Sequence, residues 1–451
     1  MAPAPAETTT LSIAPNVLTN AGTRSFVYFS RPGRSPGWTL PKIRAARMAT
    51  VTAWMTAVSL VYPIQNLAHA AGVGFGVGIN AMVARRLGEG KTWMANQTAS
   101  QGVFLSALHG MILTILGMAV IPYFLRMFTS DEVTISYGLT YFCNVFLFST
   151  IDTMGMAYEK VYQSVGKMKI SMAAVLIGCG VNIVLDPIFI FGLGPMPELG
   201  IRGAAWATGI GQTASLLFYL ILNHVKPLNV EISLREMRPS KEICGGMYSV
   251  GIAATLNMAL TSLLLTALNA ILAPFSQVYI LVLGVYYKLQ ALLYQGASGV
   301  VQGMRPLIGY NYGAGEQERV KKIFRAAFMI VGIIMTAGTL LGELVPDFLM
   351  GLFTQTPSTV EIGRTALRLI SPGFVMSTVS VIASGAFEGL GMGLKSLKIS
   401  LMRYAVIIIP IAFVLSRIIG PIGVWHAFWL AELITAVYAG ASWKRTITVS
   451  L

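Results

Sequence analysis

Two pairs of polar side chains lie inside long apolar stretches of the chain, where ionisable groups are costly and usually functional. Asp152 and Glu159 are seven residues apart, which places both on one face of a helix. Asn182 and Asp186 are four residues apart and share a face in the same way. Pro187 follows at once, so we expect the backbone there to kink or end and to free a carbonyl oxygen for a cation.

A carboxylate that faces the interior of a helix bundle can exchange protons or hold Na⁺. Thr208, just after a glycine-containing turn, would add a hydroxyl to such a site. Structural roles compete with this interpretation. Asp186 would then cap a helix or pair with Arg202 at the outer membrane boundary, and Glu159 would form a local ion pair with Lys160.

A second set of charged residues lies in apolar stretches of the other half of the chain. They are expected either to pair with one another and lock the bundle or to take part in transport, and their sequence leaves both roles open. The residues are Lys288, Arg305, Glu388, Arg403 and Glu432.

The elements that hold these residues are predicted to be membrane spans. The 451 residues are 55% hydrophobic and only 11% charged, with a mean hydropathy of +0.68, whereas soluble proteins carry about 25% charged residues. Apolar stretches of about 20 residues, the length that crosses a bilayer, recur along the chain. Eleven spans are predicted near 49–84, 97–125, 136–159, 170–191, 203–224, 243–272, 276–301, 322–345, 365–389, 397–419 and 423–443.

Basic residues are distributed unequally between the two sides of the membrane. Loops on one side collect about eighteen lysines and arginines, and loops on the other side collect about five. The richer side is expected to be cytoplasmic, which places the C-terminus inside. The net charge of +14 therefore belongs to short loops and not to one face of a folded domain, so we expect no nucleic-acid partner.

Three motifs recur in the same order in both halves, which predicts a parallel repeat of two helix bundles. The pairs are Ala157-Tyr158-Glu159 with Ala386-Phe387-Glu388, Leu87-Gly88-Glu89-Gly90 with Tyr312-Gly313-Ala314-Gly315, and Gly200-Ile201-Arg202-Gly203 with Gly420-Pro421-Ile422-Gly423. The predicted fold is an all-α polytopic membrane protein with two pseudo-symmetric bundles. Its parts are an N-lobe of five spans (49–224), a cytoplasmic linker (225–242), a C-lobe of six spans (243–443) and a cytoplasmic tail (444–451).

The segment 1–48 does not fit this pattern, because equal lobes would need a twelfth span before Ala49. Its six basic residues and its prolines interrupt every apolar run, so we expect it to lie outside the membrane. Either a translated stretch has replaced the true first helix, through a frame or start error, or the segment is a disordered exterior arm.

Other chemistry finds little support in the sequence. The cysteines and histidines lack the spacing of a disulfide scaffold or a metal site. The glycine-rich turns lack the strand and the Lys-Ser/Thr of a phosphate loop. We therefore expect neither an enzyme nor a bound cofactor or metal, apart from H⁺ or Na⁺ as a coupling ion.

Several motifs resemble the multidrug and toxic compound extrusion (MATE) family. The block from Asn182 through Asp186-Pro187 to Phe191 is the most specific, and it is followed by Gly200-Ile201-Arg202-Gly203. The segments 84–88 and 303–315 resemble the family as well. The segments 285–290 and 423–432 look like its bacterial DinF-type branch.

The resemblance implies twelve helices in two six-helix lobes and export of cationic, amphipathic compounds driven by H⁺ or Na⁺. It implies a coupling site in the N-lobe, where Asn182 and Asp186 match the fifth helix and Thr208 falls near a threonine of the sixth. An aspartate on the first helix should complete that site, yet residues 1–47 contain no aspartate. The chain therefore resembles a transporter that lacks one helix and one coupling acid.

The sequence favours a cation-coupled multidrug efflux antiporter, impaired if its first helix is lost. It is expected to act as a monomer on small cationic molecules. We place it in the bacterial cytoplasmic (inner) membrane, which it crosses several times, with a cytoplasmic C-terminus. A flippase of the same superfamily for lipid-linked substrates and a non-transporting remnant are the alternatives.

Overall fold

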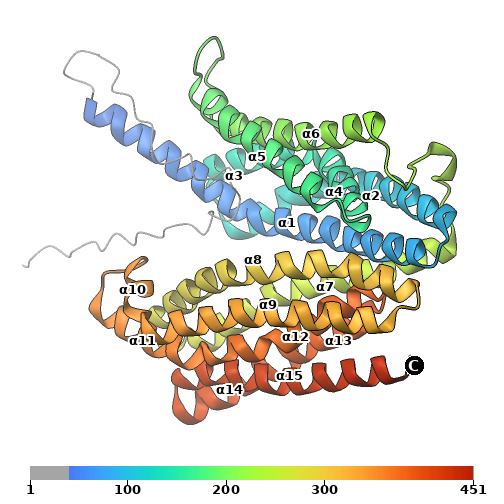
Figure 1. Cartoon of the computed structure of the whole chain (residues 1–451). Coiled ribbons are helices and arrows are strands. Elements are labelled where there is room, and N and C mark those ends of the chain that lie inside the picture. The colour runs from blue at the N-terminus through green and yellow to red at the C-terminus, as the bar shows by residue number, and fades with distance from the viewer. Residues whose placement is uncertain (1–39, 450–451) are drawn as a thin grey trace, which may run out of the picture. The chain divides into compact units, whose positions relative to one another are not determined.

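The first half of the chain forms six helices. The structure, a computed structural model, describes the backbone of residues 40–449 and the side chains of residues 50–448. Within these residues the elements are helices and turns, with no strand, which confirms the predicted all-α fold. The helices are α1 (Leu40–Gly88), α2 (Thr92–Phe128), α3 (Glu132–Phe146), α4 (Ser149–Ser164), α5 (Met168–Phe191) and α6 (Ile201–Val225) (Figure 1).

Helix α1 is longer than the first predicted span. It begins at Leu40, inside the segment that the sequence predicts to lie outside the membrane, and residues 1–39 of that segment lie outside the described residues. With 49 residues it rises about 73 Å, more than twice the thickness of the hydrocarbon core. Pro63 lies within it, in the half of the helix that precedes the glycine-rich stretch.

The second half contains more helices, several of them short or broken. α13, η3 and α14 follow one another directly and form a single span, while α15 continues into the predicted tail as far as Val449. The elements are the 3₁₀ turn η2 (Leu234–Glu236), α7 (Lys241–Leu272), α8 (Gln277–Gly313), α9 (Gln317–Leu344), α10 (Pro346–Gly351), α11 (Pro357–Ile370), α12 (Pro372–Gly389), α13 (Gly393–Leu401), the π-helix η3 (Met402–Ile407), α14 (Ile408–Ile419) and α15 (Ile422–Val449).

Eight of the described helices are long and apolar enough to cross a membrane, and the bent pair α11–α12 makes a ninth. The other two of the eleven predicted spans fall on α8 and on α3 with α4. α8 is long but carries Lys288, Arg305 and several glutamines. α3 and α4 have only 15 and 16 residues, fewer than the ~20 that a span needs, and follow each other across a short break.

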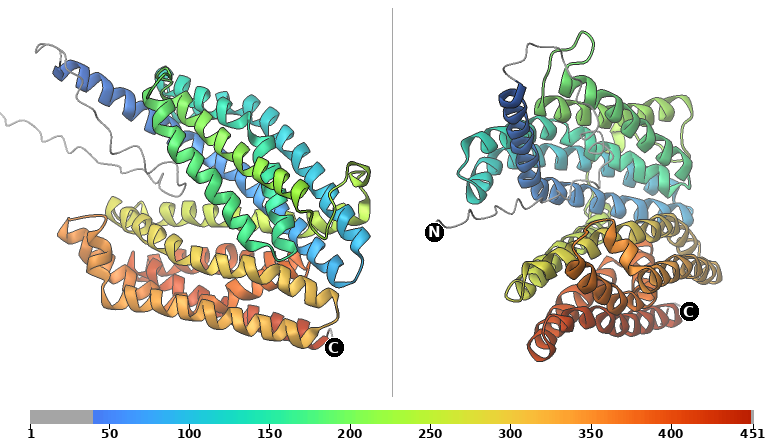
Figure 2. Two further views of the ribbon diagram at one scale, coloured as in Figure 1. Left: turned by 45° about the horizontal axis from the view of Figure 1, so that its top comes forward. Right: turned by 90° about the vertical axis from the view of Figure 1, so that its left-hand side faces the viewer.

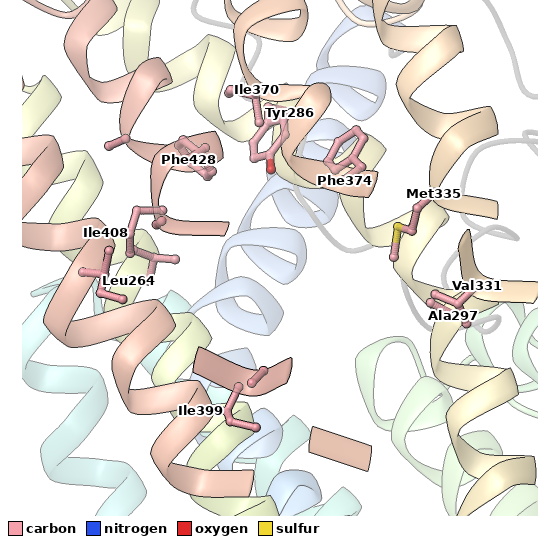
Figure 3. Packing of buried hydrophobic residues seen from close by; sticks show 14 of the residues in the cluster. Leu264, Tyr286, Ala297, Val331, Met335, Ile370, Phe374, Ile399, Ile408 and Phe428 are labelled. Atoms are coloured by element: carbon pink, nitrogen blue, oxygen red, sulfur yellow. The ribbon is translucent and has the colours of Figure 1, made fainter. Parts of the chain in front are cut away.

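The described chain packs as two compact units. Unit 1 comprises residues 40–66, 110–152 and 173–218, and unit 2 comprises residues 67–109, 153–172 and 219–449. Within unit 2, α12 packs along α15, α8 and α9 (Figures 1 and 2). The apolar core of unit 2 includes Tyr286, Phe374 and Phe428, with Tyr286 stacked on Phe374 and edge-on to Phe428 (Figure 3). The predicted division into N-lobe and C-lobe stays a prediction.

The two glycine turns that the repeat pairs with each other are in direct contact within unit 2. A Cβ added to Gly88 would lie 1.9 Å from the carbonyl oxygen of Tyr310, three residues before Gly313. A Cβ added to Gly313 would lie 2.2 Å from the carbonyl oxygen of Arg85, three residues before Gly88. The contact is therefore reciprocal, as a pseudo-two-fold repeat requires, and only glycine permits backbones to approach this closely.

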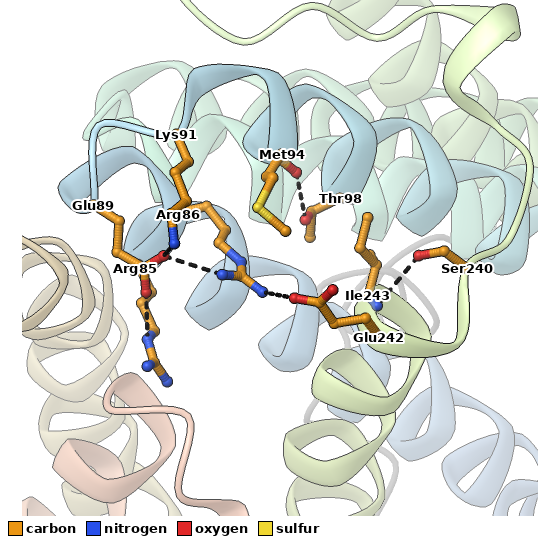
Figure 4. A network of polar contacts seen from close by, with 9 residues as sticks. All are labelled: Arg85, Arg86, Glu89, Lys91, Met94, Thr98, Ser240, Glu242 and Ile243. Atoms are coloured by element: carbon orange, nitrogen blue, oxygen red, sulfur yellow. Dashed lines mark hydrogen bonds and ion pairs between the residues drawn. The ribbon is translucent and has the colours of Figure 1, made fainter.

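The same turn carries an ion-pair network (Figure 4). The carboxylate of Glu89 accepts from Arg85 Nε and from Arg86 Nη1, both at 3.0 Å, and Lys91 Nζ lies 3.1 Å away. Arg86 also donates to Glu242 at the start of α7, at 2.8 Å. Glu89 thus fixes the arginine that ties α1 to α7. Burial acts to raise the pKa of the Glu89 carboxyl, and hydrogen bonds from Lys91, Arg86 and Arg85 outweigh it and hold that pKa below its usual value.

A pH dependence of stability follows from that lowered pKa. A carboxyl whose pKa is lower in the folded than in the unfolded state adds stability above its unfolded pKa, ~4.3, and loses it as the pH falls through the folded value. We expect Glu89→Gln to lower the melting temperature of the purified protein at pH 7 and to have no effect well below pH 4. Glu316→Gln, in the equivalent turn of the second half, is the control. A melting-temperature difference that is equal at both pH values would contradict the prediction.

Candidate functional site

Asp186 is buried in unit 1, on α5, with 3% of its surface exposed. Its side chain accepts a hydrogen bond from the Asn182 amide one turn earlier, with Nδ2 and Oδ1 3.4 Å apart. The predicted pairing of these two residues is therefore present in the structure. Of the kink or end expected at Pro187, the helix end is absent, because α5 continues through the proline to Phe191, and the kink stays a prediction.

No basic side chain in the described part of the chain forms an ion pair with Asp186. The alternative pairing with Arg202 is thus not formed, and Arg202 instead lies exposed at the start of α6. A buried carboxylate with a single amide donor leaves most of its hydrogen-bonding capacity unused. Such a group is costly in an apolar environment unless a proton or a cation neutralises it.

Close backbone packing between α5 and α6 sets the position of this pair. A Cβ on Gly211 would lie 2.7 Å from the carbonyl oxygen of Gly178 and 3.2 Å from the Cβ of Asn182. Ser215 on α6 donates to the carbonyl oxygen of Ala174 at 2.8 Å. Because small residues let the two backbones approach, Asn182 is held against α6.

Thr208 lies on α6 but its hydroxyl points to its own helix. Thr208 Oγ1 donates to the Ala204 carbonyl oxygen one turn earlier, at 2.9 Å. This bond is the usual one for a threonine within a helix, and it engages the hydrogen of the hydroxyl. The hydroxyl oxygen can still accept a hydrogen bond or bind a cation.

Two residues that the sequence analysis did not single out, Tyr141 and its neighbour Gln65, belong to the surroundings of the buried acid in unit 1. Tyr141 on α3 lies within electrostatic range of Asp186 and beside Gln65 on α1. Gln65 follows Pro63 in an apolar stretch, so its polarity was a signal that could have been used. Tyr141 gave no such signal, because tyrosines are frequent throughout the chain.

The other two candidate acids of the first half, Asp152 and Glu159, both lie on α4 but belong to different compact units. Asp152 lies in the first turn of α4, where its backbone N–H donates to the Phe148 carbonyl oxygen at 2.9 Å. Glu159 lies in unit 2 and pairs with Lys160, with Nζ and Oε1 2.8 Å apart. Gln163 also donates to Glu159, at 2.7 Å. Glu159 thus forms the local ion pair that the sequence left as an alternative.

Glu388 forms the first of two buried ion pairs in the second half, on α12 in unit 2. Arg305 Nη2 lies 2.5 Å from Glu388 Oε2. Asn257 and Ser396 both donate to Glu388 Oε1, at 3.1 and 2.9 Å. Lys288, in contrast, has no acidic partner in the described part of the chain and lies over the ring of Phe353.

Arg403 and Glu432 form the second pair, between η3 and α15. Arg403 Nε donates to Glu432 Oε1 at 2.7 Å, and Nη2 donates to the same oxygen. Arg403 Nη2 also donates to the hydroxyl of Tyr294 on α8, at 2.8 Å. Both partners are less than a tenth exposed.

The described residues contain no group of three His, Cys, Asp or Glu side chains that could hold a metal ion. A hollow of about 520 Å³ lies in unit 1 between α3 and α6, and its lining includes Asn144, Arg202 and Trp206. Asp186 is not among the residues that line it. The candidate site is therefore the Asn182–Asp186 pair and its neighbours, without a preformed metal cluster.

The fold and this site together define a multi-pass membrane transporter, because apolar helices cross the bilayer repeatedly and one of them holds an unpaired carboxylate. The MatE family model matches residues 51–188 and 253–414, and the chain belongs to this family. The family resemblance found in the sequence is confirmed. Members of the family are transporters, so the expectation that the chain is not an enzyme is confirmed as well.

Curated relatives and solved structures agree with this assignment. The multidrug export protein MepA of Staphylococcus aureus (strain MRSA252) is 25% identical over 385 residues, which cover 85% of this chain and 84% of MepA. MepA of Staphylococcus haemolyticus is equally similar over the same shares of the two chains. A structure of the outward-facing conformation of a multidrug resistance MATE family transporter is 25% identical, with a TM-score of 0.82 over 88% of each chain. A structure of MATE in complex with MaL6 matches with the same TM-score and identity.

Proposed function

We propose that this transporter is a cation-coupled antiporter that exports cationic, amphipathic compounds and uses Asp186 and Asn182 as its coupling site. One observation carries the proposal: a carboxylate that is 3% exposed has an amide donor and no basic partner in the described residues. Such a carboxylate must be neutralised from outside the protein, by H⁺ or Na⁺. An exchangeable neutralising ion is what a coupled transporter needs.

The comparisons support the cargo class. The curated relatives are named as multidrug export proteins, and a matched structure is described as a multidrug resistance transporter. We propose that the chain acts as a monomer in the bacterial cytoplasmic membrane. Its C-terminus would be cytoplasmic, as the excess of basic loop residues on that side favours.

Coupled export by the chain can be tested with ethidium in proteoliposomes. An imposed pH or Na⁺ gradient is expected to drive ethidium against its concentration gradient, and the gradient that works identifies the coupling ion. Asp186→Asn keeps the shape of the side chain but can neither be protonated as a carboxylate nor neutralise a cation. We therefore expect it to reduce gradient-driven export at least about tenfold, a loss of about 1.4 kcal/mol of coupling.

Glu198→Gln is the matched control, because Glu198 is an exposed acid in the loop between α5 and α6. Export by this variant should equal that of the unmodified chain. A version with residues 1–48 replaced by an apolar helix that carries one aspartate should be measured beside both. If Asp186→Asn exports as fast as the unmodified chain, the coupling role is wrong. If no version exports while all reach the membrane, the antiporter itself is wrong.

A further inference from the structure

The Arg403–Glu432 pair differs from the other buried ion pair of unit 2 in which oxygens of the carboxylate have partners. Both guanidinium donors of Arg403 converge on Glu432 Oε1, whereas an arginine that only locks a fold usually bridges both carboxylate oxygens. Glu432 Oε2 is enclosed and has no hydrogen-bond partner in the described residues. Glu388 Oε2 is likewise enclosed without a hydrogen-bond partner in the described residues, but Arg305 Nη2 lies 2.5 Å from it, and Asn257 and Ser396 donate to Glu388 Oε1.

A second polar group without a hydrogen-bond partner in the described residues lies on the same helix as Glu432, α15. Thr435 is one turn after Glu432 and on the same helix face, is 0% exposed, and its hydroxyl has no partner in the described residues. An unmet hydrogen-bonding group in a core is expensive, and two at one place suggest a function. Glu432 Oε2 is an acceptor without a donor, and protonation would turn it into a donor.

Arg403 has other partners that would hold it if Glu432 became neutral. Its guanidinium lies 5.0 Å from the ring centre of Tyr404 and 5.6 Å from that of Tyr294, both within the range of a cation–π contact. The Tyr294 hydroxyl accepts from Arg403 and donates in turn to Ser377 on α12, at 2.8 Å. Breaking a buried ion pair normally leaves one charge buried without its counter-charge, which costs free energy. The contacts of Arg403 with the two tyrosines reduce that cost here.

The backbone at Arg403 can also change. η3 is a π-helix, in which the N–H of Ile408 bonds to the Arg403 carbonyl oxygen five residues earlier. Single π-turns inside α-helices are rare and are frequently found at functional sites. Conversion of the π-turn to α-helix would rotate Arg403 relative to α14, so the state of the ion pair can be coupled to the shape of the span.

A proton fits this site better than a metal cation. Among the described residues, the charged and ionisable groups within electrostatic range of Glu432 are Arg403 from η3 and Tyr286, Tyr287 and Tyr294 from α8, and Tyr404 from η3 faces Arg403. α12 offers only hydroxyls here, and His426 on α15 itself is bonded to Trp429. The neighbouring guanidinium repels Na⁺, and no second carboxylate among the described residues lies within electrostatic range of Glu432 to offset that repulsion.

We propose that Glu432 is a second proton-binding site of the transport cycle, in the C-terminal half, where a proton on Oε2 exchanges with the Arg403 ion pair. The proton enters as H⁺, the carboxylate becomes a neutral acid, and Arg403 transfers to the two tyrosines without any other bond being made or broken. This inference rests on the proposed antiport, and it adds a proton to the one that Asp186 would carry.

The test counts protons per exported molecule. In proteoliposomes with the membrane potential clamped to zero, each exchanged proton supports about a tenfold ethidium gradient per pH unit. The unmodified chain is expected to reach about a hundredfold at one pH unit, with two protons. The double variant Arg403→Gln/Glu432→Gln removes both charges together, so that neither is left unpaired, and should reach only about tenfold.

The matched control is Arg305→Gln/Glu388→Gln, which neutralises the other buried pair of the same unit and should keep about a hundredfold gradient. Melting temperatures of both double variants show that they are folded. If the Arg403/Glu432 variant keeps the hundredfold gradient, or if only Na⁺ drives export by the unmodified chain, the inference is overturned while the antiport stands. If the unmodified chain builds no gradient with either ion, the proposed function itself has failed.

Discussion

Replacing Glu388 with alanine is expected to lower the free energy of unfolding of unit 2 by about 3–5 kcal/mol, the usual cost of removing one partner of a buried ion pair. Glu388 is 3% exposed, and its oxygens engage Arg305, Asn257 and Ser396, which come from α8, α7 and α13. Without the carboxylate, a largely buried guanidinium loses its counter-charge and two neutral donors lose their acceptor. The loss therefore affects four helices at once.

Equilibrium unfolding of the detergent-solubilised protein measures this effect. Glu361→Ala, which removes an exposed acid on α11, is the control and should change stability by less than about 0.5 kcal/mol. The double variant Arg305→Met/Glu388→Leu should recover most of the loss, since neither charge remains to be desolvated. A single alanine variant that unfolds within 1 kcal/mol of the unmodified chain would show that the pair contributes little.

Nine of the eleven predicted spans coincide with described helices, or a bent pair of helices, that are long and apolar enough to cross a membrane, because hydropathy over ~20 residues reports directly on the membrane. The residues at which the helices end were less predictable. α8 was predicted to end at residue 301 but continues to Gly313, since a helix can extend past the apolar region on polar residues such as Gln302 and Arg305. The predicted span 365–389 is broken at Ser371, where Pro372 starts a new helix at an angle of 47° to α11.

The Asn182–Asp186 contact was predictable because residues four apart in a helix face the same side whatever surrounds them. The positions of Tyr141 near Asp186 and of Gln65 beside Tyr141 could not be predicted, since α1, α3 and α5 meet only through tertiary packing. The π-turn at Arg403 had no signature in the sequence either, because the segment Met402–Ile407 reads as ordinary helix-forming residues. Contacts between residues of one helix could thus be predicted from the sequence, whereas contacts between helices could not.

The internal repeat shows how much of a side chain's surroundings a sequence pattern can predict. Glu159 and Glu388 occupy equivalent positions in the two halves, and both form an ion pair. The partner of Glu159 is its chain neighbour Lys160, whereas the partner of Glu388 is Arg305 on another helix. A repeat therefore preserves the position of an acid without preserving its partner. The partner determines whether the carboxylate stays in a fixed ion pair or can exchange a proton.

Gly88→Ala tests the closest backbone approach that the repeat creates. The added Cβ would meet the carbonyl oxygen of Tyr310 at 1.9 Å, far inside van der Waals contact, and a backbone atom cannot rotate away as a side chain does. We expect α1 and α8 to separate at this point and the free energy of unfolding to fall by about 2–3 kcal/mol. Gly303→Ala, on α8 where no atom lies within 4 Å of the new Cβ, should not destabilise the protein.

The reciprocity of the contact makes a sharper prediction for the double variant. Gly313→Ala alone should cost about as much as Gly88→Ala, because its Cβ would meet the Arg85 carbonyl oxygen at 2.2 Å. Once either methyl has separated the helices, the other enters space already opened, so the double variant should cost less than the sum by at least about 0.5 kcal/mol. Equilibrium unfolding of the four chains gives this coupling energy directly. Strictly additive costs would mean that the two glycines relieve independent clashes, and the symmetry seen in the turns would then have no energetic consequence.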